Sequence, residues 1–159
     1  MIPVSSDWTD LLSLLNAARA RYLIVGAHAV SHHGNPRFTA DFDVWVDSGK
    51  NNAEKVFRAL VKFGAPLHTF TLDDLAKPDV VIQIGVEPFR IDIITSVDGL
   101  NFADSWTTRS AGSFAGVPAA FISRTDLIKN KRASGRPQDL LDVESLLRKK
   151  PSPVRRRKK

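Results

Sequence analysis

The stretch Thr39-Ala40-Asp41-Phe42-Asp43-Val44-Trp45 alternates polar and apolar side chains like a half-buried β-strand. Successive strand residues point to opposite faces, so Asp41 and Asp43 project together while Phe42 and Val44 point into a core. Two adjacent carboxylates repel each other, and burying them is unfavourable without a cation. Mg²⁺, or Mn²⁺ in its place, prefers such oxygen ligands. Taken alone, such a pair more often lies on a solvated strand face near a turn than in a metal site, so the choice between the two depends on the surrounding sequence.

That context includes a third acid, Asp92, within the apolar run Arg90-Ile91-Asp92-Ile93-Ile94. An unpaired carboxylate inside an apolar strand is unfavourable. If this strand lies beside the first, three carboxylates converge, and such a set can hold two metal ions. The alternative is that Asp92 pairs with Arg90 or a nearby lysine. We consider this alternative weaker, because Arg90 and Asp92 are only neighbours on one face.

Upstream, Val25-Gly26-Ala27-His28-Ala29-Val30 joins an apolar strand to a short helix. Small residues at such a junction let backbone N–H groups approach a phosphate. His28 and His32 have the i, i+4 spacing of zinc ligands, but no third ligand follows at short range. We therefore expect packing or a position near phosphate for them, in preference to zinc binding.

The remaining pattern predicts an α/β (α+β) fold with a mixed sheet flanked by helices. We expect helices over 8–20, 27–33, 52–63, 123–135 and from 136–137 through 147, with strands over 22–25, 41–46, 80–84 and 89–94 and one or two more within 107–121. One domain is expected over residues 1–150, and a basic tail, expected to be disordered, over 151–159.

Composition narrows the class of protein. The chain has 159 residues, 43% of them hydrophobic, and no cysteine, which excludes disulfides and thiolate metal sites. Neither a signal peptide nor a membrane-spanning run is apparent, so we expect a cytoplasmic protein with no membrane partner. The net charge of +6 is concentrated in 148–159, which holds eight basic residues and no acid. Such a tail is usually solvated, although it could also bind RNA.

Several of these residues together resemble the signature of the nucleotidyltransferase superfamily, in particular its minimal and abortive-infection toxin-type members. The matching elements are Gly26-Ala27, His33-Gly34, Arg37-x-Thr39, Asp41-x-Asp43 and the later Asp92. The resemblance implies a nucleotidyltransferase-like mixed sheet flanked by helices and nucleotidyl transfer from a nucleoside triphosphate with two magnesium ions. It further implies that Asp41, Asp43 and Asp92 are catalytic metal ligands, and that Gly26 contacts the triphosphate.

By the same resemblance, Ala27 and Thr39 belong to the nucleotide-binding segment. Arg37 could reach a triphosphate oxygen or pair with one of the aspartates, and these two readings are about even. Ala27 stands where the family usually has glycine or serine, so a hydroxyl contact to phosphate is lost.

A second block is also similar to the family, which carries a lysine followed by an Arg-x-x-Asp segment. Here it reads Asp126-Leu127-Ile128-Lys129-Asn130-Lys131, then Gly135-Arg136-Pro137-Gln138-Asp139-Leu140-Leu141-Asp142. Lys131 is the better match as a catalytic lysine that neutralises phosphate charge, and Lys129 is second, as a nucleotide contact. Asp139 could orient Lys131 or Arg136. The alternative is an ordinary pair of surface helices with solvated charges.

These expectations lead to a metal-dependent nucleotidyltransferase that binds a nucleoside triphosphate. The sequence leaves the acceptor open between RNA, protein and a small molecule, and it allows a toxin role with a cognate antitoxin as partner. The alternative is a non-catalytic module that binds nucleotide or RNA on the same fold.

Overall fold

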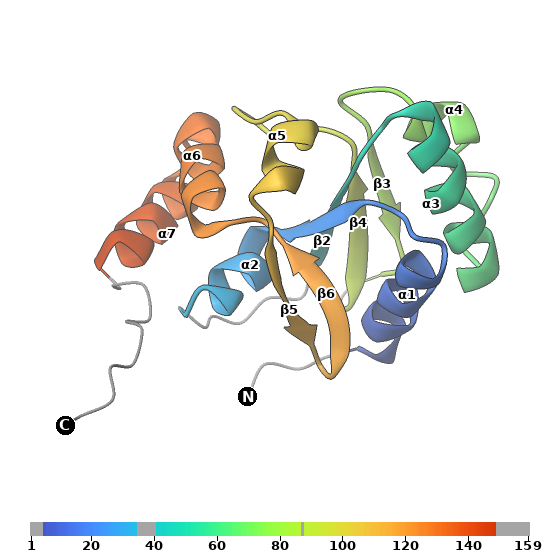
Figure 1. The fold of residues 1–159 in the computed structure, drawn as a ribbon, viewed down its shortest axis with the longest axis horizontal. Helices are drawn as coiled ribbons and strands as arrows, with labels where there is room; N and C mark the ends of the chain where they lie inside the picture. Colours follow the sequence, from blue (N-terminus) through green and yellow to red (C-terminus); the bar gives the residue numbers. More distant parts are fainter. Residues whose placement is uncertain (1–4, 35–40, 87, 149–159) are drawn as a thin grey trace.

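The computed structural model describes residues 5–34, 41–86 and 88–148, and within them a six-stranded mixed sheet lies between two groups of helices (Figure 1). The strand order is β3-β4-β2-β1-β6-β5. The elements in chain order are α1 (Ser6–Ala17), β1 (Tyr22–Val25), α2 (Gly26–His32), β2 (Asp41–Val46), α3 (Lys50–Phe63), α4 (Leu72–Leu75), β3 (Val81–Ile84), β4 (Arg90–Ile94), α5 (Phe102–Thr107), β5 (Ser110–Phe114), β6 (Val117–Phe121), α6 (Arg124–Ser134) and α7 (Pro137–Arg148). The mixed sheet flanked by helices confirms the predicted fold class.

The β2 strand lies near the middle of the sheet and fixes the register of the polar residues. It pairs antiparallel with β1, where Val25 faces Asp43, and parallel with β4, where Asp43 faces Asp92. Strands β3 and β4 are antiparallel neighbours, as are β5 and β6, while β1 and β6 run parallel. The aspartates of two segments far apart in sequence therefore meet on adjacent strands.

Each face of the sheet has its own core. Phe42 and Val44 belong to the larger cluster, which α1 and α3 cover with residues such as Trp8 and Leu60. On the opposite face, Trp45 packs into a second cluster with residues of α2, α6 and α7. Asp43 has the same parity as Trp45, so its side chain projects from the face that α6 and α7 cover.

Local sequence signals account for most helix ends. Gly64 and Gly135 end α3 and α6 in the left-handed region that favours glycine. The Ser123 side chain accepts from the backbone N–H of Asp126 at the start of α6. The first helix stops at Ala17 rather than residue 20, because Arg19 adopts a positive φ of 56°.

The structure adds two helices that the sequence pattern did not predict. The α4 helix has four residues and begins with a capping box between Thr71 and Asp74. The α5 helix has six residues, with Asn101 as its N-cap. Residues 107–121 contain two strands, β5 and β6, joined as a hairpin. No helix among the described residues is long and apolar enough to cross a membrane. The predicted tail over 151–159 lies outside the described residues.

His28 is part of the aromatic packing rather than of a zinc site. Its ring is 4% exposed and lies 4.9 Å from Trp8, 5.3 Å from Phe42 and 5.3 Å from Phe114, measured between ring centroids. The His32 ring stacks on Phe121 with a centroid distance of 3.8 Å. Burial lowers the pKa of His28 to about 4, although a hydrogen bond with the backbone of Asp41 and the Asp41 charge oppose the shift.

This buried imidazole should make folding sensitive to acid. The unfolded chain takes up a proton near the ordinary pKa of 6.5, whereas the folded chain does so only near pH 4. The free energy of unfolding therefore falls as the pH drops from 6.5 to 4, with a His28 contribution of about 3 kcal/mol. We expect His28→Gln to lose this part of the pH dependence in urea titrations at pH 7 and pH 4. The exposed His68→Gln is the matched control, and an unchanged pH dependence in His28→Gln would contradict the assignment.

Candidate functional site

Four polar side chains form a square on one face of the parallel pair β2 and β4. Asp41 faces Arg90 across the ladder, and Asp43 faces Asp92. Residues two apart on a strand project to the same side, so all four share the face covered by α6 and α7. The structure therefore brings the three predicted aspartates into one neighbourhood.

Arg90 is the cation within this square. Its Nη2 lies 3.1 Å from Asp41 Oδ2, and its Nε lies 3.2 Å from Asp92 Oδ1. The sequence analysis treated an Arg90–Asp92 pair as the weaker alternative, and the structure shows that this judgement was wrong. The physical reason is the register, which places Arg90 directly opposite Asp41 and beside Asp92, within reach of both carboxylates.

Asp43 is the aspartate that opens toward a cavity, and its pKa is raised to about 7. Burial is the largest cause, followed by the charges of Asp92 and Asp41 and a hydrogen bond with Asp92, while the charge of Lys131 opposes the shift. Burial also raises the pKa of Asp92, although the Arg90 charge opposes this. A carboxylate held close to like charges in this way is a characteristic of functional sites.

Gly26 lies against Asp43 where β1 passes into α2. Its φ is +69°, a conformation that favours glycine, and an added Cβ would overlap Asp43 Oδ2. A side chain at this position would therefore both strain the backbone and displace the carboxylate. The next residue, Ala27, is 7% exposed, so its methyl group is buried.

An open cavity of about 200 Å³ joins this face of the sheet to the α6–α7 pair. It is lined by Val25, Gly26, Asp43, Ile94, Ser96, Val97, Asp98, Asn130, Lys131, Ser134, Arg136 and Asp139. Both sequence blocks that carry the predicted residues thus contribute to one cavity. The sequence analysis did not identify Asp98, Asn130 or Ser134, although Ser134 could have been inferred from its i+3 spacing to Lys131 on one helix.

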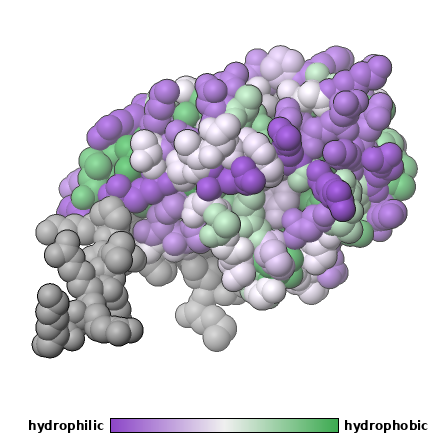
Figure 2. Space-filling view, viewed as in Figure 1, coloured by the Kyte–Doolittle hydropathy of each residue, from purple (hydrophilic) through white to green (hydrophobic). Residues whose placement is uncertain are grey.

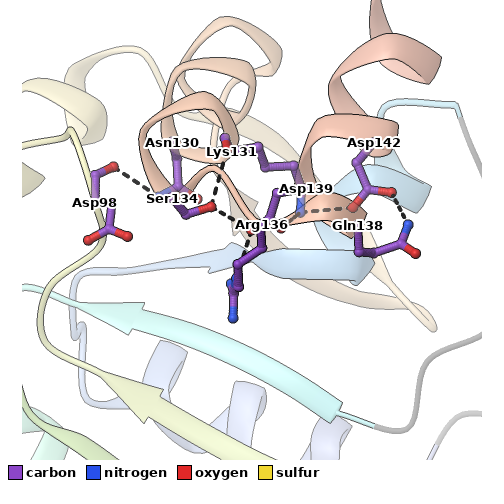
Figure 3. A network of polar contacts seen from close by, with 8 residues as sticks. All are labelled: Asp98, Asn130, Lys131, Ser134, Arg136, Gln138, Asp139 and Asp142. Carbon is purple, nitrogen blue, oxygen red and sulfur yellow. Dashed lines mark hydrogen bonds and ion pairs between the residues drawn. The ribbon is translucent and has the colours of Figure 1, made fainter.

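Lys131 belongs to a buried polar network between α6 and α7 (Figure 3). Its Nζ lies 3.1 Å from Asp139 Oδ1 and 3.0 Å from Asp142 Oδ2, and the residue is 5% exposed. Gln138 Nε2 donates to Asp142 Oδ1 at 3.0 Å. Two carboxylates thus share the Lys131 charge, and of these only Asp139 was expected from the sequence.

Asp139 connects this network to the cavity wall. Although burial alone would raise its pKa, hydrogen bonds from Ser134, Arg136 and Lys131 lower it to about 2. The expectation that Asp139 could orient Lys131 or Arg136 corresponds to contacts with both, since Arg136 Nε lies 2.8 Å from Asp139 Oδ2.

Arg136 is held at its Nε by Asp139. Its side chain is 78% exposed, and Figure 3 shows the guanidinium extending away from the network toward the strands. Among the described residues, no other side chain makes an ion pair or hydrogen bond with its two terminal nitrogens. A guanidinium anchored at one nitrogen and open at two others can bind an anion in a fixed orientation.

The other predicted residues lie elsewhere. Lys129 is exposed and lines a separate groove with Thr125, Ile128, Arg132 and Leu147, so the structure does not bring it to the cavity with Asp43. Arg37 and Thr39 lie outside the described residues.

The fit of a metal ion can be tested on this geometry. Carboxylate oxygens suit Mg²⁺ or Mn²⁺, and the raised pKa of Asp43 shows negative charge in need of compensation there. In residues 5–34, 41–86 and 88–148, however, no three His, Asp or Glu side chains are already grouped around one point. Asp43 and Asp92, side by side on adjacent strands, offer two carboxylates of the kind that a divalent ion takes, and Arg90 contacts both Asp41 and Asp92.

Comparison with solved structures places the fold. The chain is similar to a lincosamide antibiotic adenylyltransferase in its lincomycin-bound form, with a TM-score of 0.59 and 17% identity, over 92% of this chain and 98% of that one. It is also similar to a putative nucleotidyltransferase from Thermotoga maritima, with a TM-score of 0.57 and 11% identity, over 94% and 98% of the two chains. It is similar as well to an antigenic nucleotidyltransferase-like protein from Paracoccidioides brasiliensis, with a TM-score of 0.52 and 15% identity, over 92% of this chain and 78% of that one.

No family model matches the sequence, and no curated protein matches it. The solved structures therefore establish the nucleotidyltransferase fold for this chain, at identities too low to transfer a substrate.

The contact between Gly26 and Asp43 yields a test of the site. We expect Gly26→Ala to lower the free energy of unfolding by roughly 1–3 kcal/mol, because it combines strain at positive φ with overlap on Asp43. Gly116→Ala is the control for strain alone, since φ is +85° there and a Cβ would meet nothing within 4 Å. In a double-mutant cycle by urea denaturation, Asp43→Ala should relieve part of the Gly26→Ala loss. Strict additivity of the two changes would show that the contact is absent.

Proposed function

We propose that this chain is a metal-dependent nucleotidyltransferase, which transfers a nucleoside monophosphate from a nucleoside triphosphate to an acceptor. One observation carries the proposal: Asp43 and Asp92 lie side by side on β2 and β4, beside a cavity whose opposite wall presents Lys131 and Arg136. Acids on one wall and cations on the other suit a metal-bound triphosphate. The nucleotidyltransferase fold of the solved relatives supports the same reaction class.

Asp43 and Asp92 are the residues proposed to hold the divalent ion, Mg²⁺ or Mn²⁺, with Asp41 beside them. Such an ion would neutralise phosphate charge and activate the oxygen that attacks the phosphorus. The raised pKa of Asp43 fits this role, because the carboxylate is held in a state that a cation would stabilise.

The chain's own residues would position the substrate. Gly26 leaves the space that the Asp43 carboxylate occupies, and Arg136 offers its two open nitrogens to phosphate oxygens. Lys131 adds buried positive charge behind the cavity wall, and Asp139 holds both cations in place. In this proposal Lys131 stabilises the phosphate charge from within the network without touching it, and Arg136 contacts the phosphate oxygens directly.

The acceptor remains open in this proposal between RNA, protein and a small molecule. The lincomycin-bound adenylyltransferase shows that a chain of this fold can act on a small antibiotic, and this chain covers 98% of it. An RNA or protein acceptor would fit a toxin controlled by a cognate antitoxin. Labelling of a cell extract distinguishes these acceptors by whether the label appears on RNA, protein or a small molecule.

Replacing Asp43 tests the reaction. We expect Asp43→Asn to reduce transfer of label from each α-labelled nucleoside triphosphate to background, because the neutral amide cannot hold the cation, while circular dichroism stays unchanged. Asp10→Asn, an exposed acid on α1, is the matched control and should keep full transfer. If Asp43→Asn still transfers label, the assignment of this cavity is wrong. If the wild-type protein binds nucleotide without metal dependence and never transfers it, the non-catalytic alternative holds.

Replacing Arg136 tests the triphosphate contact. We expect Arg136→Met to lower kcat/KM for the nucleoside triphosphate roughly 10- to 100-fold, because charge-assisted hydrogen bonds to phosphate are lost. Arg132→Met removes an exposed arginine of α6 that lies outside the cavity and should leave kcat/KM unchanged. Equal kinetics in both variants would place the triphosphate elsewhere.

A further inference from the structure

Arg90 sits where a divalent ion would otherwise compensate the aspartates. It is the cross-strand partner of Asp41 and lies two residues before Asp92, and it contacts both at 3.1 Å and 3.2 Å. Its side chain is 27% exposed, so these contacts are partly shielded from solvent. The backbone register alone determines this placement, because Arg90 projects from the same face of the sheet as all three acids.

The balance of charge among these side chains limits how many divalent ions they can hold. Three carboxylates at Asp41, Asp43 and Asp92 carry three negative charges when ionised, and the Arg90 guanidinium removes one of them permanently. One divalent ion then neutralises the rest. A second divalent ion held by Asp41 and Asp92 would have to displace Arg90, or stay close to its charge in a half-buried place where repulsion is weakly screened.

We propose that Arg90 takes the place of a second protein-bound cation, so that this chain binds one divalent ion, at Asp43 and Asp92. This inference rests on the proposed function, since it concerns the ion count of the same site. It departs from the two ions that the family resemblance implies. Arg90 is a positioning residue in this sense: it orients Asp41 and Asp92 and limits the number of ions.

Ion counting without any nucleotide tests the proposal. We expect isothermal titration of the full chain with Mn²⁺ to give one ion for the wild-type protein and two for Arg90→Met. The electron paramagnetic resonance spectrum should show isolated Mn²⁺ in the wild-type protein. In Arg90→Met it should show the coupling of two ions, which lie about 3.5–4 Å apart in two-metal sites. A merely structural arginine would not change the ion count.

Two further variants keep the test decisive if Arg90→Met folds poorly. Arg90→Lys retains the positive charge and should still bind one ion. Asp41→Asn removes a partner of Arg90 but neither proposed ligand, so it should also bind one ion. Circular dichroism of each variant with and without Mn²⁺ confirms that the folded protein is being titrated.

The outcomes separate this inference from the proposed function. Two ions bound to the wild-type protein would overturn the inference while leaving the metal-dependent transferase intact. One ion bound to both the wild-type protein and Arg90→Met would likewise overturn it. No Mn²⁺ bound to any variant would remove the metal site from the proposed function and the inference with it. Only one ion in the wild-type protein and two in Arg90→Met supports the proposal.

Discussion

The pairing of Asp43 with Asp92 across two parallel strands is the constraint on which the site depends. Two carboxylates on directly opposed positions repel each other, and partial burial makes the repulsion stronger. The strands can hold this unfavourable pair because their other faces are well packed. Phe42, Val44 and Ile93 are fully buried in the larger core, which holds the β2–β4 ladder in register. Stability on one face of the sheet thus supports electrostatic strain on the other.

On the opposite wall of the cavity, the buried charges are paired with one another. Between α6 and α7, the buried Lys131 contacts two carboxylates, and Ser134 and Arg136 complete the hydrogen bonding of Asp139. Each buried charge there has a partner, which is the condition under which such a network is tolerated. The cavity therefore has one internally balanced wall and one wall that carries excess negative charge. The proposed divalent ion would therefore be held on the β2–β4 side.

The sequence predicted the parts of this arrangement that follow from periodicity. Alternation showed that Asp41 and Asp43 share a face, and the apolar surroundings of Asp92 showed that its charge needs compensation. The pairing register between β2 and β4 could not be predicted, because nothing local specifies which residue of one strand opposes which residue of the other. For that reason the contact of Arg90 with both acids was underestimated. The helices α4 and α5 were missed because a single turn offers too little periodicity to detect.

The segment around Lys131 also shows where prediction from the sequence stops. Lys131 was identified by type and position, but its partners come from the following helix, where Asp139 and Asp142 have the i, i+3 spacing that puts two acids on one helix face. That spacing was a usable signal that the lysine would be shared between carboxylates. Lys129, two residues before it, necessarily points away, because positions i and i+2 of a helix do not share a face. About half a helical turn therefore separates a residue of the cavity from a residue of the outer surface.

The charges around the cavity also favour one kind of ligand over another. A free anion entering beside Asp43 would meet the like charges of Asp41, Asp92 and, at the rim, Asp98, with Arg136 as its exposed counter-charge. An anion that arrives together with a divalent ion meets the opposite situation, because the ion faces the acids and the anion faces the arginine. In such a ligand the positive charge would face the acidic wall and the negative charge would face Arg136. In the proposed site, a metal-bound phosphate chain would thus be favoured over bare phosphate, with Asp43 and Asp92 on the side of the metal and Arg136 on the side of the phosphates.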